Sequence, residues 1–179
     1  DLPRNFTTAE KHLPPTNINY HNAFLALHHQ ISSKWKFTTQ LGYMNFTQIG
    51  SSMWPDSLKA NGDMYRSIGI WDARGKNLLG QAFVTGEVQT GSLQHKILAG
   101  IDLGHKQYMA TWGQSFKLNG TDGPFNVYHP EYGKADASIV PFDRSMPLKD
   151  RADYHEDERY AGFYAQDEIH LFNDMLRLT

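Results

Sequence analysis

Histidines and carboxylates are the residues of this 179-residue sequence that could carry acid–base or metal chemistry. The nine histidines include the adjacent pair His28 and His29, but they form neither an H-E-x-x-H motif nor a pair at the helical i, i+4 spacing. Those are arrangements in which histidines hold zinc, so we expect isolated surface or lumen histidines and no metal ligands. The G-x-S-x-G, P-loop and G-x-G-x-x-G motifs of nucleophile and nucleotide sites are also absent. We therefore predict no catalytic residues, no cofactor and no enzyme activity.

Acidic residues are densest in the stretch 150–158. Such a charged stretch is typical of the solvated rim of a loop, and a cation site is the alternative interpretation. An enzyme hypothesis would use the same residues, as a glycan-active β-protein with its carboxylates near Asp153.

Composition narrows the class of protein. The net charge of −2 gives no electrostatic reason to expect binding to nucleic acid. The lack of cysteine excludes disulfides and thiolate metal sites. No apolar run approaches the ~18 residues of a membrane helix, but strands can still cross a bilayer because half of their residues are polar.

The clearest pattern lies in residues 34–46, where side-chain character alternates with a period of two, as in a β-strand with one face in an apolar medium. The apolar face consists of Trp35, Phe37, Thr39, Leu41 and Tyr43. It spans nine residues and has an aromatic residue at each end. A transmembrane strand needs roughly 9–11 residues and carries aromatic girdles at both interfaces. A soluble sandwich strand alternates in the same way but usually has about 5–6 residues.

Similar alternation predicts further strands at 17–31, 78–89, 93–112 and 159–171, with another beginning at 175–179. Four residues break the alternation: Phe24, His29, Phe83 and Asp167. The sequence thus predicts an all-β protein, an antiparallel meander of about six strands.

The connections between these strands alternate strictly in length. Short turns are expected at 32–33, 90–92 and 172–174, and long loops at 49–76 and 113–157. Within the first loop we expect local pairing of 64–71 and a tight turn at 74–76. The alternation of turns and loops is typical of a barrel in an outer membrane. A sandwich has no reason to keep it.

Four sequence blocks resemble TonB-dependent siderophore receptors, ferrichrome receptors in particular. Residues 93–102 (LQHKILAGID) resemble the H-x-L-L-x-G-V-D strand of that family, and residues 83–91 (FVTGEVQTG) resemble the strand and T-G turn before it. Residues 125–133 (FNVYHPEYG) are similar to its N-P-x-Y-G loop segment, and residues 160–169 (YAGFYAQDEI) to its G-x-Y-x-Q-D strand.

The resemblance implies that residues 1–179 are a fragment of a 22-stranded transmembrane β-barrel with long extracellular loops, without the plug domain and the remaining strands. The start at Asp1 and the end within an alternating stretch agree with a piece of a longer chain. The implied location is the bacterial outer membrane. The implied function is energy-coupled uptake of ferric siderophores, which the fragment cannot perform alone. The implied partners are a siderophore of hydroxamate type, the TonB complex through the absent plug, and outer-membrane lipid.

In such a receptor, the ligand would contact lumen-facing aromatics near the long loops. Extending the polar-face register along 34–46 and 93–112 gives the candidate siderophore-binding residues Phe46, Lys106, Tyr108 and Trp112. The alternative is that these aromatics only pack against loops or the plug.

A soluble ligand-binding β-sandwich or small β-barrel, with the aromatic faces as its core, is the alternative function. A second layer enclosing the apolar face would favour this alternative and contradict the membrane hypothesis. The residues that test this point are Trp35, Phe37, Leu41, Ile97 and Ile101.

Overall fold

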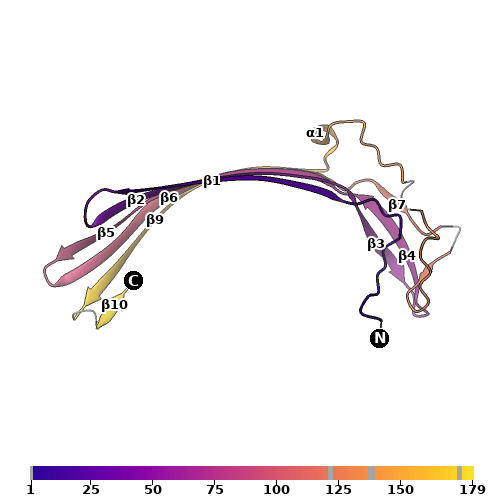
Figure 1. The fold of residues 1–179 in the computed structure, drawn as a ribbon, viewed down its shortest axis with the longest axis horizontal. Helices are drawn as coiled ribbons and strands as arrows, with labels where there is room; N and C mark the ends of the chain where they lie inside the picture. The colour runs from indigo at the N-terminus through magenta and orange to yellow at the C-terminus, as the bar shows by residue number, and fades with distance from the viewer. Residues whose placement is uncertain (1, 121–122, 137–139, 173–174) are drawn as a thin grey trace. The chain divides into compact units, whose positions relative to one another are not determined.

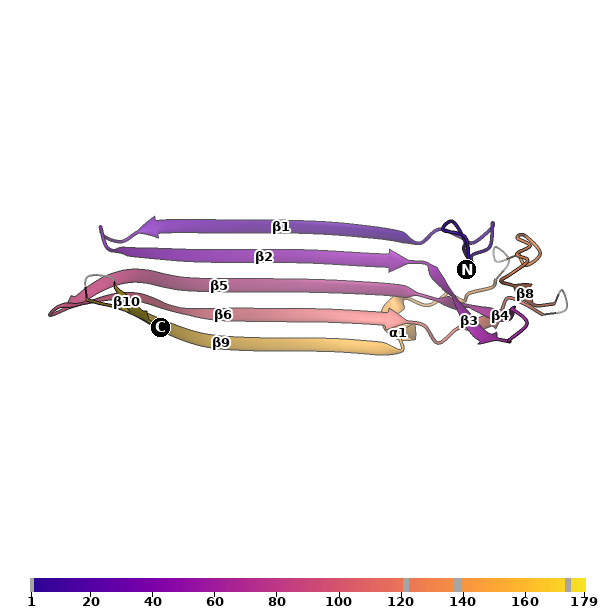
Figure 2. The same ribbon diagram turned by 90° about the horizontal axis from the view of Figure 1, so that it is seen from below.

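The computed structural model describes residues 2–120, 123–136, 140–172 and 175–179, and it confirms an all-β protein (Figure 1). Its larger sheet has six antiparallel strands whose order follows the chain, as the alternation predicted (Figure 2). The strands are β1 (Asn17–Gln30), β2 (Trp35–Ile49), β5 (Asp72–Thr90), β6 (Leu93–Thr111), β9 (Tyr154–Leu171) and β10 (Leu176–Leu178).

A smaller sheet forms within the two long connections. Strands β3 (Ser51–Leu58) and β4 (Asp63–Ile70) make an antiparallel hairpin, and β7 (Ser115–Lys117) and β8 (Phe125–Asn126) pair with β4. The hairpin turns at Gly62, whose φ of 90° favours glycine. The local pairing expected for 64–71 is therefore confirmed.

The tight turn expected at 74–76 is wrong, because these residues lie inside β5. Gly75 is not among the glycines with positive φ. Residues 72–90 instead form one continuous strand, and just before it the Trp71 N–H donates to Gly50 O at 3.0 Å. The strand expected to begin at 159 also begins earlier, at Tyr154.

The short turns agree with the prediction. The Ile31 N–H donates to Trp35 O at 2.9 Å to close the β1–β2 turn, and Gly91, with φ of 61°, lies in the β5–β6 turn. The third expected turn falls partly on residues 173–174, which lie outside the described residues. Among the residues described, no helix is long and apolar enough to cross a membrane, and α1 (Leu148–Arg151) has four residues.

The chain divides into two compact units, which we name the loop unit and the strand unit. The loop unit contains Asp1–Asn19, Phe46–Arg74 and Tyr108–His155, and the strand unit contains Tyr20–Asn45, Gly75–Gln107 and Glu156–Thr179.

The buried apolar side chains of the described residues all belong to the loop unit. They include Met64, Phe125 and Val127, which form one cluster with Phe6 and Tyr132 packed against it. The loop unit therefore has a core of its own.

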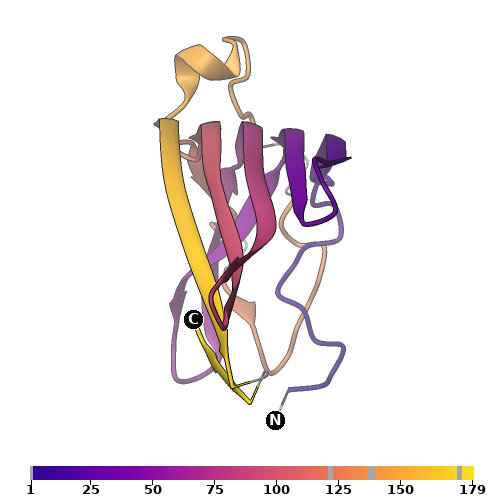
Figure 3. The ribbon, with the colours of Figure 1, turned by 90° about the vertical axis from the view of Figure 1, so that its left-hand side faces the viewer.

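The strand unit is a single layer of strands, which Figure 3 shows as one row. On its apolar face, Leu41 and Ile101 are 48% and 37% exposed, and Trp35, Phe37 and Ile97 are half-buried. None of these five side chains is enclosed by a second layer. The structure therefore does not contradict the membrane hypothesis at these five residues.

Glycines in the strand unit lie under aromatic rings of neighbouring strands. The Trp35 ring covers Gly86 on β5, and the Tyr160 ring covers Gly104 on β6. Phe83 and Tyr164 flank Gly100, so Phe83 faces the polar side of the sheet. This neighbour explains why Phe83 breaks the alternation of its strand.

Candidate functional site

Two of the four candidate residues, Tyr108 and Trp112, meet at a third aromatic residue in the loop unit. The Trp112 ring stacks on Tyr154, with centroids 6.0 Å apart and an interplanar angle of 27°. The Tyr108 ring lies 6.1 Å from the same tyrosine at 57°. Trp112 and Tyr154 are 52% and 41% exposed. These three residues, which we name the aromatic cluster, offer solvent a large amphipathic surface.

Asp153 holds the aromatic cluster together. Its Oδ2 accepts the backbone N–H groups of Trp112 and Gly113, each at 2.7 Å, and the Thr111 hydroxyl at 2.8 Å. These bonds, that from Trp112 first, lower the pKa of Asp153 and keep it ionised. Its own N–H donates to Ala110 O at 2.9 Å. Asp153 therefore fixes the end of β6 beside the start of β9, and the interpretation of 150–158 as only a solvated rim is incomplete.

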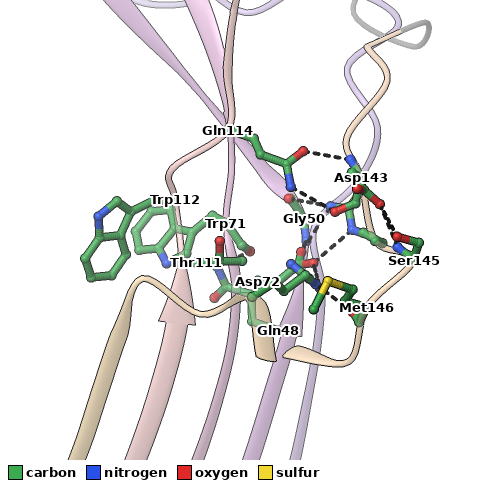
Figure 4. A network of polar contacts seen from close by, with 12 residues as sticks. Gln48, Gly50, Trp71, Asp72, Thr111, Trp112, Gln114, Asp143, Ser145 and Met146 are labelled. Carbon is green, nitrogen blue, oxygen red and sulfur yellow. Dashed lines mark hydrogen bonds and ion pairs between the residues drawn. The ribbon is translucent and has the colours of Figure 1, made fainter. Parts of the chain in front are cut away.

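A second carboxylate, Asp72, fastens the connection that leads into β9 (Figure 4). It is 1% exposed and accepts hydrogen bonds from Arg144 at 2.9 and 3.0 Å and from Arg151 at 2.6 Å. The Gly50 N–H donates to it as well, at 3.0 Å. Burial alone would raise the pKa of Asp72, but the bonds from Arg144, Arg151 and Gly50 outweigh burial and lower it.

Gln114 adds a further link to the same connection. Its Nε2 donates to Asp143 O at 2.8 Å, and its Oε1 accepts the Asp143 N–H at 2.7 Å (Figure 4). The Asp143 carboxylate in turn accepts the N–H and hydroxyl of Ser145, which lower its pKa. The segment before α1 is thus tied down by backbone, amide and ionic bonds together.

A buried ion pair stabilises the rest of the loop unit. Arg66 is 2% exposed, and its Nη2 lies 2.5 Å from Glu10 Oε1. Its other donors bond to Asn119 Oδ1 at 2.8 Å and Thr8 O at 2.7 Å, and its guanidinium lies 4.2 Å from the centroid of the Phe125 ring. Arg66 lines a cavity of about 250 Å³ together with Asn119 and Phe125. With each nitrogen of Arg66 engaged, the pair is built for stability and not for capture of an anion.

The other two candidate residues have different surroundings. In the strand unit, Lys106 Nζ lies 2.6 Å from Glu156 Oε1, so its charge is already balanced. Phe46 is half-buried in β2. The structure thus brings together Tyr108 and Trp112 but pairs Lys106 with an acid.

The sequence did not reveal Tyr154 as part of the aromatic cluster. Residues 154–159 read Tyr-His-Glu-Asp-Glu-Arg, so both faces of this part of β9 are polar and no period of two can be detected. The tyrosine beside a run of acids was the only available signal. Among the described residues, no group of three or more His, Asp or Glu side chains is placed to hold a metal ion.

No protein-family model matches the sequence, and no curated protein matches it significantly. A function must therefore be argued from the residues and geometry of this chain.

Proposed function

We propose that this chain forms part of the barrel of a TonB-dependent receptor in a bacterial outer membrane, which takes up ferric siderophores. One observation carries the proposal: the strand unit is a single sheet, and no described part of the chain forms a second layer over its apolar face. Its large apolar side chains stay exposed, among them Leu27, Leu41, Leu103 and Phe163, the last at 85%. In water such a face would drive aggregation, whereas acyl chains would cover it without cost.

The order of connections supports the same proposal. The β1–β2 and β5–β6 turns are short, whereas both long connections fold into the loop unit with its own core and ion pairs. Short turns on the periplasmic side and long, structured loops outside are what an outer-membrane barrel requires. Six strands in an open sheet would then be one section of the 22-stranded wall.

The aromatic cluster is the surface proposed to contact ligand. Stacked rings held by Asp153 suit a bulky, partly apolar chelate such as a ferric hydroxamate, because rigid aromatics lose little entropy on binding. Lys106 would take part only if the ligand displaced Glu156. The chain supplies no bond chemistry in this proposal. Energy coupling through the TonB complex would belong to the plug, so these residues alone would not transport.

The soluble alternative is less well supported. A β-sandwich or small β-barrel needs a layer over the apolar face, and in the described residues the buried apolar side chains lie elsewhere, in the loop unit.

Two measurements on the full-length protein test the proposal. Cell fractionation should place it in the outer membrane. A strain lacking its gene should lose uptake of radiolabelled iron supplied as a ferric hydroxamate and regain it on complementation, with uptake of ferric citrate as the control. A protein that stays monomeric in buffer without detergent would contradict the proposal.

A further inference from the structure

Two of the residues that interrupt the apolar face of the strand unit bond to each other. His95 on β6 and Asp167 on β9 lie across the strand pair, with Nδ1 and Oδ2 2.8 Å apart. A second pair of the same kind occurs further along the same two strands, where His105 Nε2 lies 3.0 Å from Asp157 Oδ1. On β6 and β9 the apolar face is made by odd-numbered residues, such as Ile97 and Phe163. All four residues of the two pairs are odd-numbered as well, so both pairs lie on this face.

Only apolar side chains separate the two pairs on these strands. They are Ile97, Ala99, Ile101 and Leu103 on β6, and Ala161, Phe163 and Ala165 on β9. Arg159 lies at the edge of this stretch and not inside it. The Tyr160 ring covers Gly104, which places these two residues opposite each other on β9 and β6. Because the strands are antiparallel, the preceding residue, Arg159, lies opposite the following residue, His105. On this face of β6 and β9, the polar groups therefore gather at two levels of the sheet.

The two aromatic residues that bound the apolar stretch of β2, Trp35 and Tyr43, lie at nearly the same two levels. Gly42 on β2 lies beside Leu79 on β5, so the next residue, Tyr43, lies opposite Leu78. Phe83 on β5 lies beside Gly100 on β6, and the same register places Leu78 opposite His105. Tyr43 and His105 are therefore at the same height in the sheet. Trp35 covers Gly86 and by the same counting lies level with Ile97, one step inside His95. Aromatic rings and His–Asp pairs, on different strands, thus mark the same limits.

The distance between the two His–Asp pairs matches the thickness of the hydrocarbon layer of a membrane. His95 and His105 are ten residues apart, which is roughly 33 Å along a strand at about 3.3 Å per residue. At the ~40° tilt of a barrel strand this becomes about 25 Å, the height of the lipid-facing band of outer-membrane barrels. Within it, the polar side chains on this face of β1, β2, β5, β6 and β9 are His29 and Thr39, and the Thr39 hydroxyl donates to Gln81 O at 3.0 Å.

We propose that bilayer hydrocarbon covers this face only between the His95–Asp167 and His105–Asp157 pairs, and that lipid head groups begin at the pairs. This rests on the proposed function and adds to it the two depths at which lipid contact changes. Charged side chains are costly at the midplane of a bilayer and nearly free at its interfaces, so the ends of the band are where such pairs can persist. The pairs end the band even where the next residue, Leu93, is apolar.

Single cysteines provide the test, because these 179 residues contain none. The full-length protein, with any other cysteine replaced, is labelled with bimane at Leu93→Cys, Ile101→Cys or Gln107→Cys in phosphatidylcholine bilayers. The matched control is Asp102→Cys, the neighbour of Ile101 on the opposite face. Lipid brominated in mid-chain should quench the label at 101 several-fold more than at 93 or 107, and should leave the label at 102 unquenched.

Each other outcome has a distinct meaning. Quenching at 93 or 107 equal to that at 101 would overturn the proposed limits while leaving membrane insertion intact. No quenching at 101 would instead contradict the proposed function, and equal quenching at 101 and 102 would overturn the assignment of faces and the inference with it. Adding His105→Leu with Asp157→Leu should raise quenching at 107, and no rise would refute the role of that pair.

Discussion

Asp153 Oδ2 accepts the backbone N–H of Trp112 at 2.7 Å, and the ring of that tryptophan stacks on Tyr154, the next residue after Asp153. One carboxylate therefore joins the end of β6 to the start of β9 and orients two aromatic rings, one just after β6 and one at the start of β9. The rings are exposed, but their backbone is fixed. This combination, a rigid base under an open aromatic surface, is what a ligand-contacting wall needs.

If the proposed function holds, Trp112→Ala should weaken binding of a ferric hydroxamate to the full-length protein by about fivefold, because it removes stacking worth about 1 kcal/mol. Equilibrium quenching of intrinsic fluorescence by the ligand measures this affinity. The control is Trp54→Ala, which removes a 59% exposed tryptophan from β3 in the same unit. Equal effects of the two substitutions would remove the aromatic cluster as the contact surface.

Asp153→Asn should loosen the aromatic cluster without changing its shape. The amide keeps one acceptor oxygen but loses the charge that strengthens its bonds to the N–H groups of Trp112 and Gly113. Hydrogen exchange of those two amides should become roughly tenfold faster, as expected for the loss of about 1.4 kcal/mol. Unchanged exchange at both amides would show that the charge of Asp153 contributes nothing to the local structure.

Sequence patterns predicted the strand unit well, since one face of each strand carries mostly apolar side chains and the period of two is visible. What they could not resolve was Asp167, which looked like a defect. Its partner His95 is 72 residues away, and no local pattern indicates such a pair. The interruption of the apolar face is thus explained by a cross-strand bond.

The loop unit was read mostly as irregular for a related reason. Its stability depends on bonds between distant residues, such as Arg66 with Glu10, 56 residues apart, and Asp72 with Arg144, 72 apart. Hairpin pairing in 64–71 could be predicted because it is local, with turn residues at Gly62 and Asp63. Long-range ion pairs leave no periodic signal, so the sequence alone does not predict the fold of this unit.

Asp72→Asn should release the segment that carries Arg144 and Arg151. Removing one partner of a buried ion pair costs about 3–5 kcal/mol, and the lower end is expected because Arg144 can regain water through its 35% exposed side chain. Trypsin cleavage after Arg144 or Lys149 should then be roughly hundredfold faster, since cleavage follows the population of the opened state. The matched control is Asp150→Asn, which changes an exposed carboxylate. If trypsin cleaved both variants equally fast, the ion pairs of Asp72 would not be what holds the segment in place.

The ion pairs of Asp72 with Arg144 and Arg151 should weaken at acid pH. The pKa of Asp72 is lowered in the folded chain, so its stabilising contribution is complete above the ordinary aspartate pKa of about 3.9 and is lost as pH falls through the lower folded value. Acid-stable pepsin should therefore cut the segment near Arg144 increasingly as pH falls below about 4. Asp72→Asn should be cut at the same rate across this range, and a parallel rise in the variant would assign the effect to other groups.

Gly104→Ala should destabilise the strand unit, because a Cβ at this position would overlap the Tyr160 ring. Overpacking of this kind typically costs about 1–3 kcal/mol. Gly162→Ala on β9 is the matched control, since the nearest atom to its added Cβ is Asp102 Cβ at 4.0 Å. The urea midpoint of the full-length protein in detergent micelles should fall for Gly104→Ala and stay constant or rise for Gly162→Ala, because alanine restricts the unfolded chain more than glycine. If Gly104→Ala combined with Tyr160→Ala is no more stable than Gly104→Ala alone, the ring is not what excludes a side chain there.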